Sequence, residues 1–471
     1  MTATTMLRAR PGPVTRNRSR ATLWWARIVC LSVFGPYVTG SARTEQIAVF
    51  ASFAAILIVG WPRIVNARSI PVTPFLVVWL GLDAVMLIGA VRRPFDPAFY
   101  GPQPVSHGLA AYMLPVALIV LTWYWTLSAD SRDLIRAVAP VIIGGMALNT
   151  AISLAQLVTH HVAVFSSLPR FWDAPGSTGS VAVNAAENGR WTGIFDQPAE
   201  AGVAYGVALL CLIWLSQRRQ VHPLTTTVCA AAIVTGGLLT ISKVFLLAAL
   251  PLAVLVTLRS PRGRVGIVVC AAAILGLLRV LGSAHLLPAW PQGAVSLGRF
   301  LNPSGSLAAQ YTAGRYGAGG SLGPAVADVL HASPWYGFGA GGLATAYDSL
   351  WVQVLVLAGI AGVIFAVAAL VMLTFRWWCL RGVAAPAEWR LAGAVLVLAA
   401  AASLGLPSLT ANRDATLLWL VLGILITARP PLDPGAERRG ETHGYRRATP
   451  PPRRQAGHRR LRPHLGRPVR L

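Results

Sequence analysis

Residues 189–220 read GRWTGIFDQPAEAGVAYGVALLCLIWLSQRRQ, and this stretch decides the class of fold. A mostly apolar run from 199 to 215 separates a polar stretch from the basic sequence SQRRQ. A run of this length suits one helical crossing of a bilayer, and basic residues collect on the cytoplasmic side of such crossings. The stretch therefore predicts a transmembrane helix whose N-terminal, polar end lies outside the cytoplasm.

The composition extends this prediction to the whole chain. Of 471 residues, 55% are apolar and only 12% are charged, which is too little polar surface for a water-soluble protein of this size. Twelve apolar stretches are long enough, or nearly long enough, to span a membrane. They lie near 22–39, 47–61, 74–91, 109–128, 134–158, 199–215, 224–241, 244–258, 265–282, 349–373, 391–407 and 415–428. We therefore expect an all-α, polytopic integral membrane protein with about 12 transmembrane helices.

The distribution of charge orients these helices. With the N-terminus inside, one side of the membrane collects 29 Lys and Arg against 6 Asp and Glu, and the other side collects 9 of each. This asymmetry predicts that both termini are cytoplasmic. The net charge of +24 is thus a topology signal, with some attraction to anionic lipid, and not a sign of nucleic-acid binding.

The orientation divides the chain into three parts. Residues 1–20 are expected to form a basic cytoplasmic tail, 21–428 the transmembrane domain, and 429–471 a disordered basic cytoplasmic tail. Two long loops lie outside, at about 159–198 and about 283–348, and long loops between rigid elements often carry function. Neither the histidines nor the cysteines show metal-ligand spacing, so we expect no metal and no cofactor.

The polar stretch at 189–202 introduces the next predicted span. Pro198 suits the first turn of a helix, and Gly202 and Gly206, four residues apart, allow close approach of another helix. Arg190 falls at the lipid–water boundary, where it is either part of a site or an interfacial anchor whose side chain reaches for water.

Three more polar residues stand out on the same outer side. Lys243, the single lysine of the chain, falls at a short outer turn, where a lysine is often simply solvated. Arg315 belongs to the second long loop, in a segment that can form a surface helix up to Pro334. Asp348 stands at the start of the tenth span, where an acid either caps the helix or serves chemistry.

In order and spacing, four pieces of this outer face resemble the O-antigen ligase and polymerase superfamily, polytopic glycosyltransferases of the bacterial inner membrane. The resemblance covers roughly residues 140–375. Its pieces are GRWTGIFDQPAEAG at 189–202, ISKVFLLAAL at 241–250, GR at 314–315 followed by SPWYGFGAGG at 333–342, and DSLWVQVLVLAGIAG at 348–362.

Residue by residue, the resemblance implies catalytic roles for Lys243, Arg315 and Asp348. The family has arginine where this chain has Lys243 and histidine where it has Asp348, and these differences favour a polymerase-like member. We further expect a second set of residues to bind the substrate: Arg190, Gln197, Glu200, Arg299 and Tyr336.

The implied reaction transfers a glycan from a polyprenyl diphosphate to a sugar hydroxyl. Arginine and lysine supply permanent positive charge to the leaving diphosphate, and a carboxylate accepts the proton of the attacking hydroxyl. We expect Asp348 to be that base, with Glu200 and Asp196 as alternative candidates. The expected partners are a polyprenyl-diphosphate-linked oligosaccharide, a glycan acceptor, the lipid bilayer and envelope polysaccharide assembly proteins, but no nucleic acid.

A different class of function fits the same composition. A transporter or a flippase for lipid-linked oligosaccharides also has many spans, and Arg27, Asp83 and Arg279, which fall within predicted spans, could line its pathway. Against this alternative, the sequence shows no internal repeat, and its polar residues concentrate in outer loops.

Overall fold

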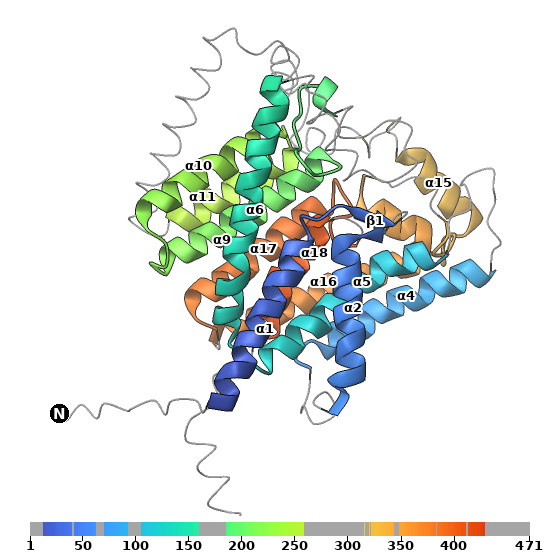
Figure 1. Cartoon of the computed structure of the whole chain (residues 1–471). Coiled ribbons are helices and arrows are strands. Elements are labelled where there is room, and N and C mark those ends of the chain that lie inside the picture. The colour runs from blue at the N-terminus through green and yellow to red at the C-terminus, as the bar shows by residue number, and fades with distance from the viewer. Residues whose placement is uncertain are drawn as a thin grey trace, which may run out of the picture. The chain divides into compact units, whose positions relative to one another are not determined.

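Helices make up most of the described part of the computed structural model, which confirms the all-α prediction (Figure 1). The structure describes residues 13–39, 42–62, 70–92, 105–159, 185–258, 315, 320, 322–342, 348–382, 384–410 and 413–428. The first half contains α1 (Pro13–Ser32), β1 (Tyr37–Thr39), β2 (Ala42–Arg43), α2 (Thr44–Val59), α4 (Thr73–Arg92), α5 (Val105–Thr126) and α6 (Ser131–Thr159). The second half contains α9 (Pro198–Gln217), α10 (Pro223–Leu239), the π-helix η2 (Phe245–Ala249), α11 (Leu250–Leu258), α15 (Gly323–Ala332), α16 (Leu350–Cys379), the 3₁₀-helix η3 (Leu380–Gly382), α17 (Pro386–Ala402) and α18 (Arg413–Ile426).

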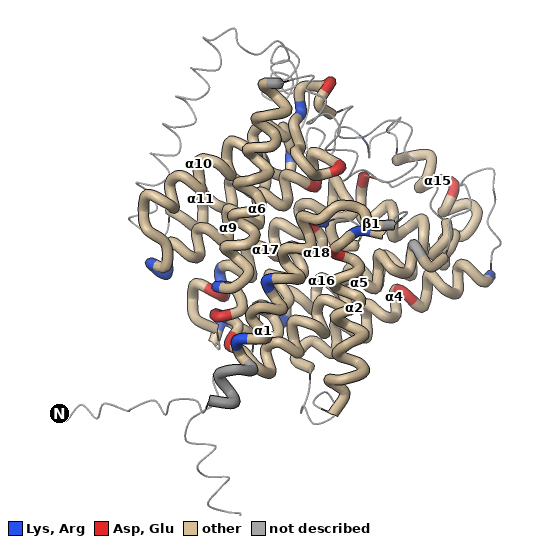
Figure 2. The backbone as a smooth tube through the Cα atoms, in the orientation of Figure 1, with Lys and Arg blue, Asp and Glu red and all other residues tan. Residues whose placement is uncertain are grey.

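Eleven of the twelve predicted spans overlap helices of the structure, although the one predicted at 22–39 continues past the end of α1 into β1. The twelfth, 265–282, lies outside the described residues. Within the described part, five helices are both long enough and apolar enough to cross a membrane: α4, α5, α6, α9 and α16. Long stretches of these helices carry no charged residue (Figure 2). Helix α1 begins at Pro13, inside the segment expected as the N-terminal tail, and residues 429–471 lie outside the described part.

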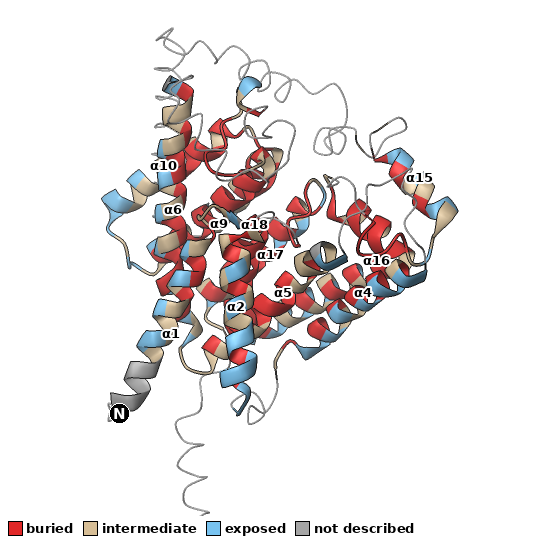
Figure 3. Ribbon diagram, turned by 45° about the vertical axis from the view of Figure 1, so that its right-hand side comes forward, coloured by how far each residue is buried: buried red, intermediate tan, exposed pale blue. Residues whose placement is uncertain are grey.

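Helix α9 lies at the centre of the packing. In an apolar stretch of 18 residues within α9, 83% of the residues are buried, compared with 39% for α6 and 44% for α4. Helix α9 contacts α6, α10, α17 and α18 (Figure 3). A Cβ at Gly202 would lie 2.1 Å from Ser242 Oγ, and one at Gly206 would lie 2.7 Å from Ala249 Cβ. Gly206 therefore allows the close approach of a neighbouring helix, η2, as predicted, whereas Gly202 allows the close approach of the turn that precedes η2.

Helix α16 is bent sharply at Gly359, whose φ of 64° and ψ of −159° no other residue adopts easily. Residues 350–358 form one arm and 360–379 the other. The arms approach each other, since Trp351 of the first arm lines an apolar groove together with residues of the second: Val367, Leu370, Val371, Thr374, Phe375 and Trp378. A straight helix would separate Trp351 and Trp378 by about 40 Å.

The segment 333–339 replaces the helical hydrogen bonds that the bend breaks. Phe338 N–H donates to the Val356 carbonyl at 2.7 Å, and Ile360 N–H donates to the Pro334 carbonyl at 2.7 Å. Gly337 and Gly339, at φ of 61° and 83°, allow this segment to lie directly on the backbones of α16 and α4. The glycine-rich part of the second long loop is thus packed against the helices.

Candidate functional site

The turn between α10 and η2, residues 240–243, presents Lys243 at the same end of the helices as the start of α9. Ile241 has a φ of 45°, which turns the chain tightly, and Ser242 is fully buried against Gly202 of α9. Because Gly202 has no side chain, the turn can lie directly on the first turn of α9.

The Arg190 side chain is hydrogen-bonded to this turn. Its Nε donates to the Thr240 carbonyl at 3.2 Å and its Nη2 to the Ile241 carbonyl at 3.4 Å, while Trp191 N–H donates to the Leu239 carbonyl at 2.9 Å. These contacts fix the guanidinium within the protein, which is not the behaviour of a side chain that only anchors at the lipid–water boundary.

Arg315 and Asp348 form an ion pair, with 2.9 Å between Nη2 and Oδ2. Both side chains are partly exposed. The cap of α16 is the next residue, Ser349, whose side chain accepts a hydrogen bond from Val352 N–H at 3.4 Å. Asp348 is therefore not the capping residue, and its carboxylate is directed to a cation.

These four side chains act on one another electrostatically. Burial lowers the pKa of Arg190; the positive charge of Arg315 lowers it further, and Asp348 opposes the change. Burial and the charges of Arg315 and Arg190 likewise lower the pKa of Lys243. Three cations and one carboxylate from separate parts of the chain thus gather at one place, and we call Arg190, Lys243, Arg315 and Asp348 the cationic cluster.

The remaining predicted site residues lie elsewhere. The Tyr336 ring lies under the guanidinium of Arg92 at the end of α4, with 5.0 Å between Cζ and the ring centroid. Gln197 is the residue before α9 and makes no capping contact through its side chain. Arg299 lies outside the described residues. Asp196 and Glu200 belong to a second group of charged residues.

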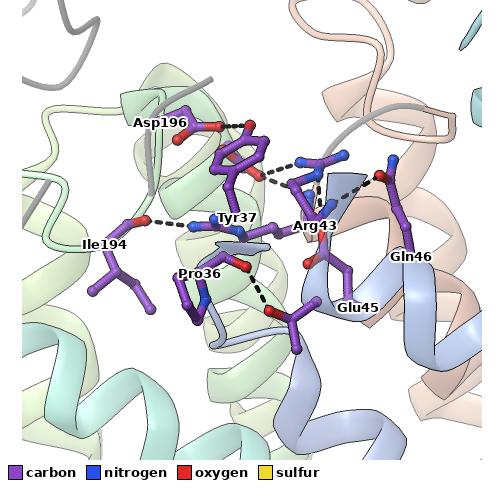
Figure 4. Close-up of polar contacts among 10 residues, drawn as sticks. Pro36, Tyr37, Arg43, Glu45, Gln46, Ile194 and Asp196 are labelled. Carbon is purple, nitrogen blue, oxygen red and sulfur yellow. Dashed lines mark hydrogen bonds and ion pairs between the residues drawn. The ribbon is translucent and has the colours of Figure 1, made fainter. Parts of the chain in front are cut away.

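This second group, the buried charge network, joins the β1–β2 hairpin to the starts of α2, α9 and α18 (Figure 4). Its members are charged or phenolic side chains that are mostly hidden from solvent: Tyr37, Arg43, Glu45, Asp196, Glu200 and Arg413.

Short polar contacts connect the network. Arg43 Nε lies 2.9 Å from Glu45 Oε1, and Arg43 Nη1 lies 3.9 Å from Glu200 Oε1. Arg413 donates its backbone N–H to Glu200 Oε1 at 2.7 Å and its Nη1 to the Ile194 carbonyl at 2.6 Å. The Tyr37 hydroxyl donates to Asp196 Oδ2 at 2.9 Å. The arginines thereby hold the stretch 194–200 in place from two sides.

Burial and the nearby Glu200 carboxylate raise the pKa of Asp196 to about 7, against the pull of Arg413 and Arg43. Burial and the Asp196 charge raise the pKa of Tyr37, so the phenol stays neutral and donates. Asp196 is therefore a carboxyl that takes up and releases a proton near neutral pH.

Sequence reasoning missed Arg43 and Arg413. A signal existed, because both arginines, like Lys243, belong to segments that the sequence predicts to lie on the side of the membrane where positive charge is scarce. In the part of the chain that the structure describes, no three residues among His, Cys, Asp and Glu are grouped to hold a metal ion.

No family model matches the chain, and no curated protein matches it.

Proposed function

We propose that the protein is a membrane glycosyltransferase of the O-antigen polymerase or ligase type. It transfers a glycan from a polyprenyl diphosphate to a sugar hydroxyl on the outer face of the cytoplasmic membrane. The observation that supports this proposal is the cationic cluster, in which Arg190, Lys243 and Arg315 lie close enough to act on one another and Arg315 pairs with the acid Asp348. A cluster with an excess of positive charge at the end of apolar helices suits a lipid-borne diphosphate.

The proposal includes a topology. Twelve helices cross the membrane, both termini are cytoplasmic, and the long loops at about 159–198 and 283–348 face outward. All four members of the cationic cluster then lie on the outer side.

The ion pair between Arg315 and Asp348 suggests how the reaction starts. The donor diphosphate competes with Asp348 for the Arg315 guanidinium, since a phosphate accepts more hydrogen bonds and carries more charge than one carboxylate. Asp348 is then free to accept the proton of the attacking hydroxyl. The bond from the anomeric carbon to the diphosphate oxygen breaks, the bond to the acceptor oxygen forms, and the three cations stabilise the leaving diphosphate.

The test measures polymer formation in membranes after single substitutions. Arg315→Ala and Asp348→Asn are each expected to abolish polymer while the membrane abundance of the protein stays near normal. Single lipid-linked repeat units should then accumulate on the outer side. Asp328→Asn, on α15 of the same loop, is the matched control and should retain activity. Full activity of Asp348→Asn would show that Asp348 is not the base.

A second candidate function is a transporter or a flippase for lipid-linked oligosaccharides. Asp83, buried within α4, favours it because buried acids in membrane helices often serve transport. The same experiment separates the two functions: if the Arg315 variant prevents lipid-linked units from reaching the outer leaflet, the transport function is correct.

A further inference from the structure

The apolar groove between the two arms of α16 has the size of a ligand site. It encloses about 460 Å³, and ligand sites in proteins have volumes of roughly 300–1,000 Å³. Six of its seven lining residues are apolar or aromatic, and the seventh, Thr374, donates its hydroxyl proton to the Leu370 carbonyl at 2.8 Å. The groove therefore suits an apolar chain.

The length of the groove corresponds to one leaflet of a bilayer. Val367 and Trp378, which both line it, are 11 residues apart along the second arm, a rise of about 16 Å. This is half of the roughly 30 Å of a hydrocarbon core, which α16 is long enough and apolar enough to cross. The acyl chain of a phospholipid in one leaflet matches this length, whereas a polyprenyl chain is much longer and would extend beyond the groove.

A guanidinium lies at the Trp378 end of the groove. Arg381 of η3 has its Cζ 5.4 Å from the centroid of the Trp378 ring and 5.9 Å from that of Trp389. Trp389 stacks on Trp377 with 4.9 Å between centroids, and each of these two indole N–H groups donates to the other residue's carbonyl. The fixed rings hold the guanidinium in place without neutralising its charge.

The other charged groups near this end are committed to partners of their own. Glu388, beside Trp389 in the sequence, pairs with Arg132 and Arg218. Arg376 donates to the carbonyls of Ile426 and Ala428. Among the described residues, no carboxylate pairs with Arg381, whose side chain is exposed. Its hydrogen-bond donors are therefore available to an anion from outside the protein.

We propose that the groove and Arg381 form a binding site for one anionic glycerophospholipid. An acyl chain lies in the groove, and the phosphate of the headgroup binds the Arg381 guanidinium, which matches a phosphate in charge and geometry. Trp378 belongs to both parts of the site, since it lines the groove and lies under the guanidinium. Tryptophans are typical of the level of the headgroups in a membrane.

The bound lipid would support the bend in α16. Its acyl chain contacts Trp351 of the first arm and the residues of the second arm, and so fills the space between them. In the orientation proposed above, the lipid belongs to the cytoplasmic leaflet. The inference needs α16 to cross a membrane, but it does not depend on the proposed glycosyl transfer.

Native mass spectrometry of the purified full-length protein in detergent tests the headgroup contact. The probes are dioleoyl phosphatidylglycerol, which is anionic, and dioleoyl phosphatidylcholine, which has no net charge. The wild type should bind phosphatidylglycerol more tightly, and Arg381→Gln should weaken this binding about fivefold, the effect of one basic residue near a lipid headgroup, without changing phosphatidylcholine binding. Arg219→Gln removes another exposed arginine and is the matched control, which should bind both lipids as the wild type does.

A second substitution tests the acyl chain. Val371 is 56% exposed, so Val371→Trp can fill the groove without disturbing the core, and it should weaken the binding of both lipids. Leu255→Trp, at a 55% exposed position of α11, is the matched control and should bind both lipids normally. Because the two substitutions remove the same bound lipid, Val371→Trp combined with Arg381→Gln should bind phosphatidylglycerol no more weakly than Val371→Trp alone.

Three results would overturn the proposal. Equal affinity of the wild type for the two lipids would show a groove that does not recognise the headgroup. Unchanged phosphatidylglycerol binding by Arg381→Gln or by Val371→Trp would place the lipid elsewhere on the protein. If Val371→Trp weakens the binding of undecaprenyl phosphate but not that of phosphatidylglycerol, the groove holds a polyprenyl chain instead.

Discussion

Glu200 accepts a hydrogen bond from the backbone N–H of Arg413 at 2.7 Å, and so joins the first turn of α9 to the first residue of α18 across 213 positions of sequence. Glu200 is 1% exposed and Arg413 is fully buried. The contact satisfies a backbone donor at the start of a helix, which has no partner within the helix itself.

Glu200→Ala should therefore be strongly destabilising. It leaves the buried charges of Arg43 and Arg413 without this acid, and removal of one partner of a buried ion pair costs about 3–5 kcal/mol. Glu200→Gln keeps an acceptor for the Arg413 N–H and should lose less. Thermal unfolding in detergent measures both, with Glu187→Ala, an exposed position shortly before α9, as the control. Similar unfolding temperatures for Glu200→Ala and the control would contradict the role of the network.

Gly202→Ala should displace the turn that carries Lys243. The added Cβ would lie 2.1 Å from Ser242 Oγ, and such overpacking costs about 1–3 kcal/mol. The double variant Gly202→Ala, Ser242→Gly should recover much of the lost stability. Gly144→Ala, where nothing lies within 4 Å of the new Cβ, is the matched control. If the double variant does not recover stability, the contact between positions 202 and 242 is not the cause of the loss.

The raised pKa of Asp196 predicts that the stability of the protein depends on pH. Its folded pKa of about 7 lies above the unfolded value of about 4, so between these values the folded protein binds the extra proton. The stability contributed by that proton is present below pH 4 and is lost as the pH rises to about 7. Asp196→Asn can still accept a hydrogen bond from the Tyr37 hydroxyl but cannot titrate. It should therefore flatten this part of a plot of unfolding temperature against pH. An unchanged slope would mean that another group titrates.

Lys243→Arg should retain activity, because it keeps the positive charge and places at this turn the residue type that the resembled family carries. Lys243→Ala should reduce the rate of polymer formation by about 100-fold, the effect of removing one group that stabilises developing charge. Initial rates with a lipid-linked repeat unit separate the two variants. Equal rates for Lys243→Ala and wild type would remove Lys243 from the site.

Reporter fusions test the proposed orientation. Fusions at Ser177 and Gly305 should report the outer side of the membrane, and a fusion at Arg219 should report the cytoplasm, as the division of basic residues requires. A cytoplasmic signal from either long loop would reverse the assignment of the cationic cluster to the outer face.

Local patterns in the sequence predicted the helices well. The span predicted at 199–215 appears as α9, since its length, its Pro198 start and its small residues all favour one outcome. The sequence also pointed to Arg190, Lys243 and Asp348, which stand beside predicted spans, and to Arg315 in the second long loop. Their expected roles came from the family resemblance.

The bend at Gly359 and the buried charge network were not predicted, for one shared reason. Both depend on contacts between segments that are distant in sequence, such as Ile194 with Arg413. Helical periodicity describes one element at a time and holds no information on such partners. The span predicted at 349–373 was read as one continuous helix for the same reason.

The bend in α16 has a consequence for the order of synthesis. The carbonyl groups that accept hydrogen bonds from Ile360 and Ala361 belong to Pro334 and Trp335, which the ribosome completes before it reaches Gly359. When the second arm leaves the ribosome, the residues that complete its first turn have therefore already been made. A circular permutation that places residues 333–339 after α16 would allow the same contacts between this segment and α16 in the final structure. Until that segment is made, however, the backbone groups at the bend would have no partners within the bilayer.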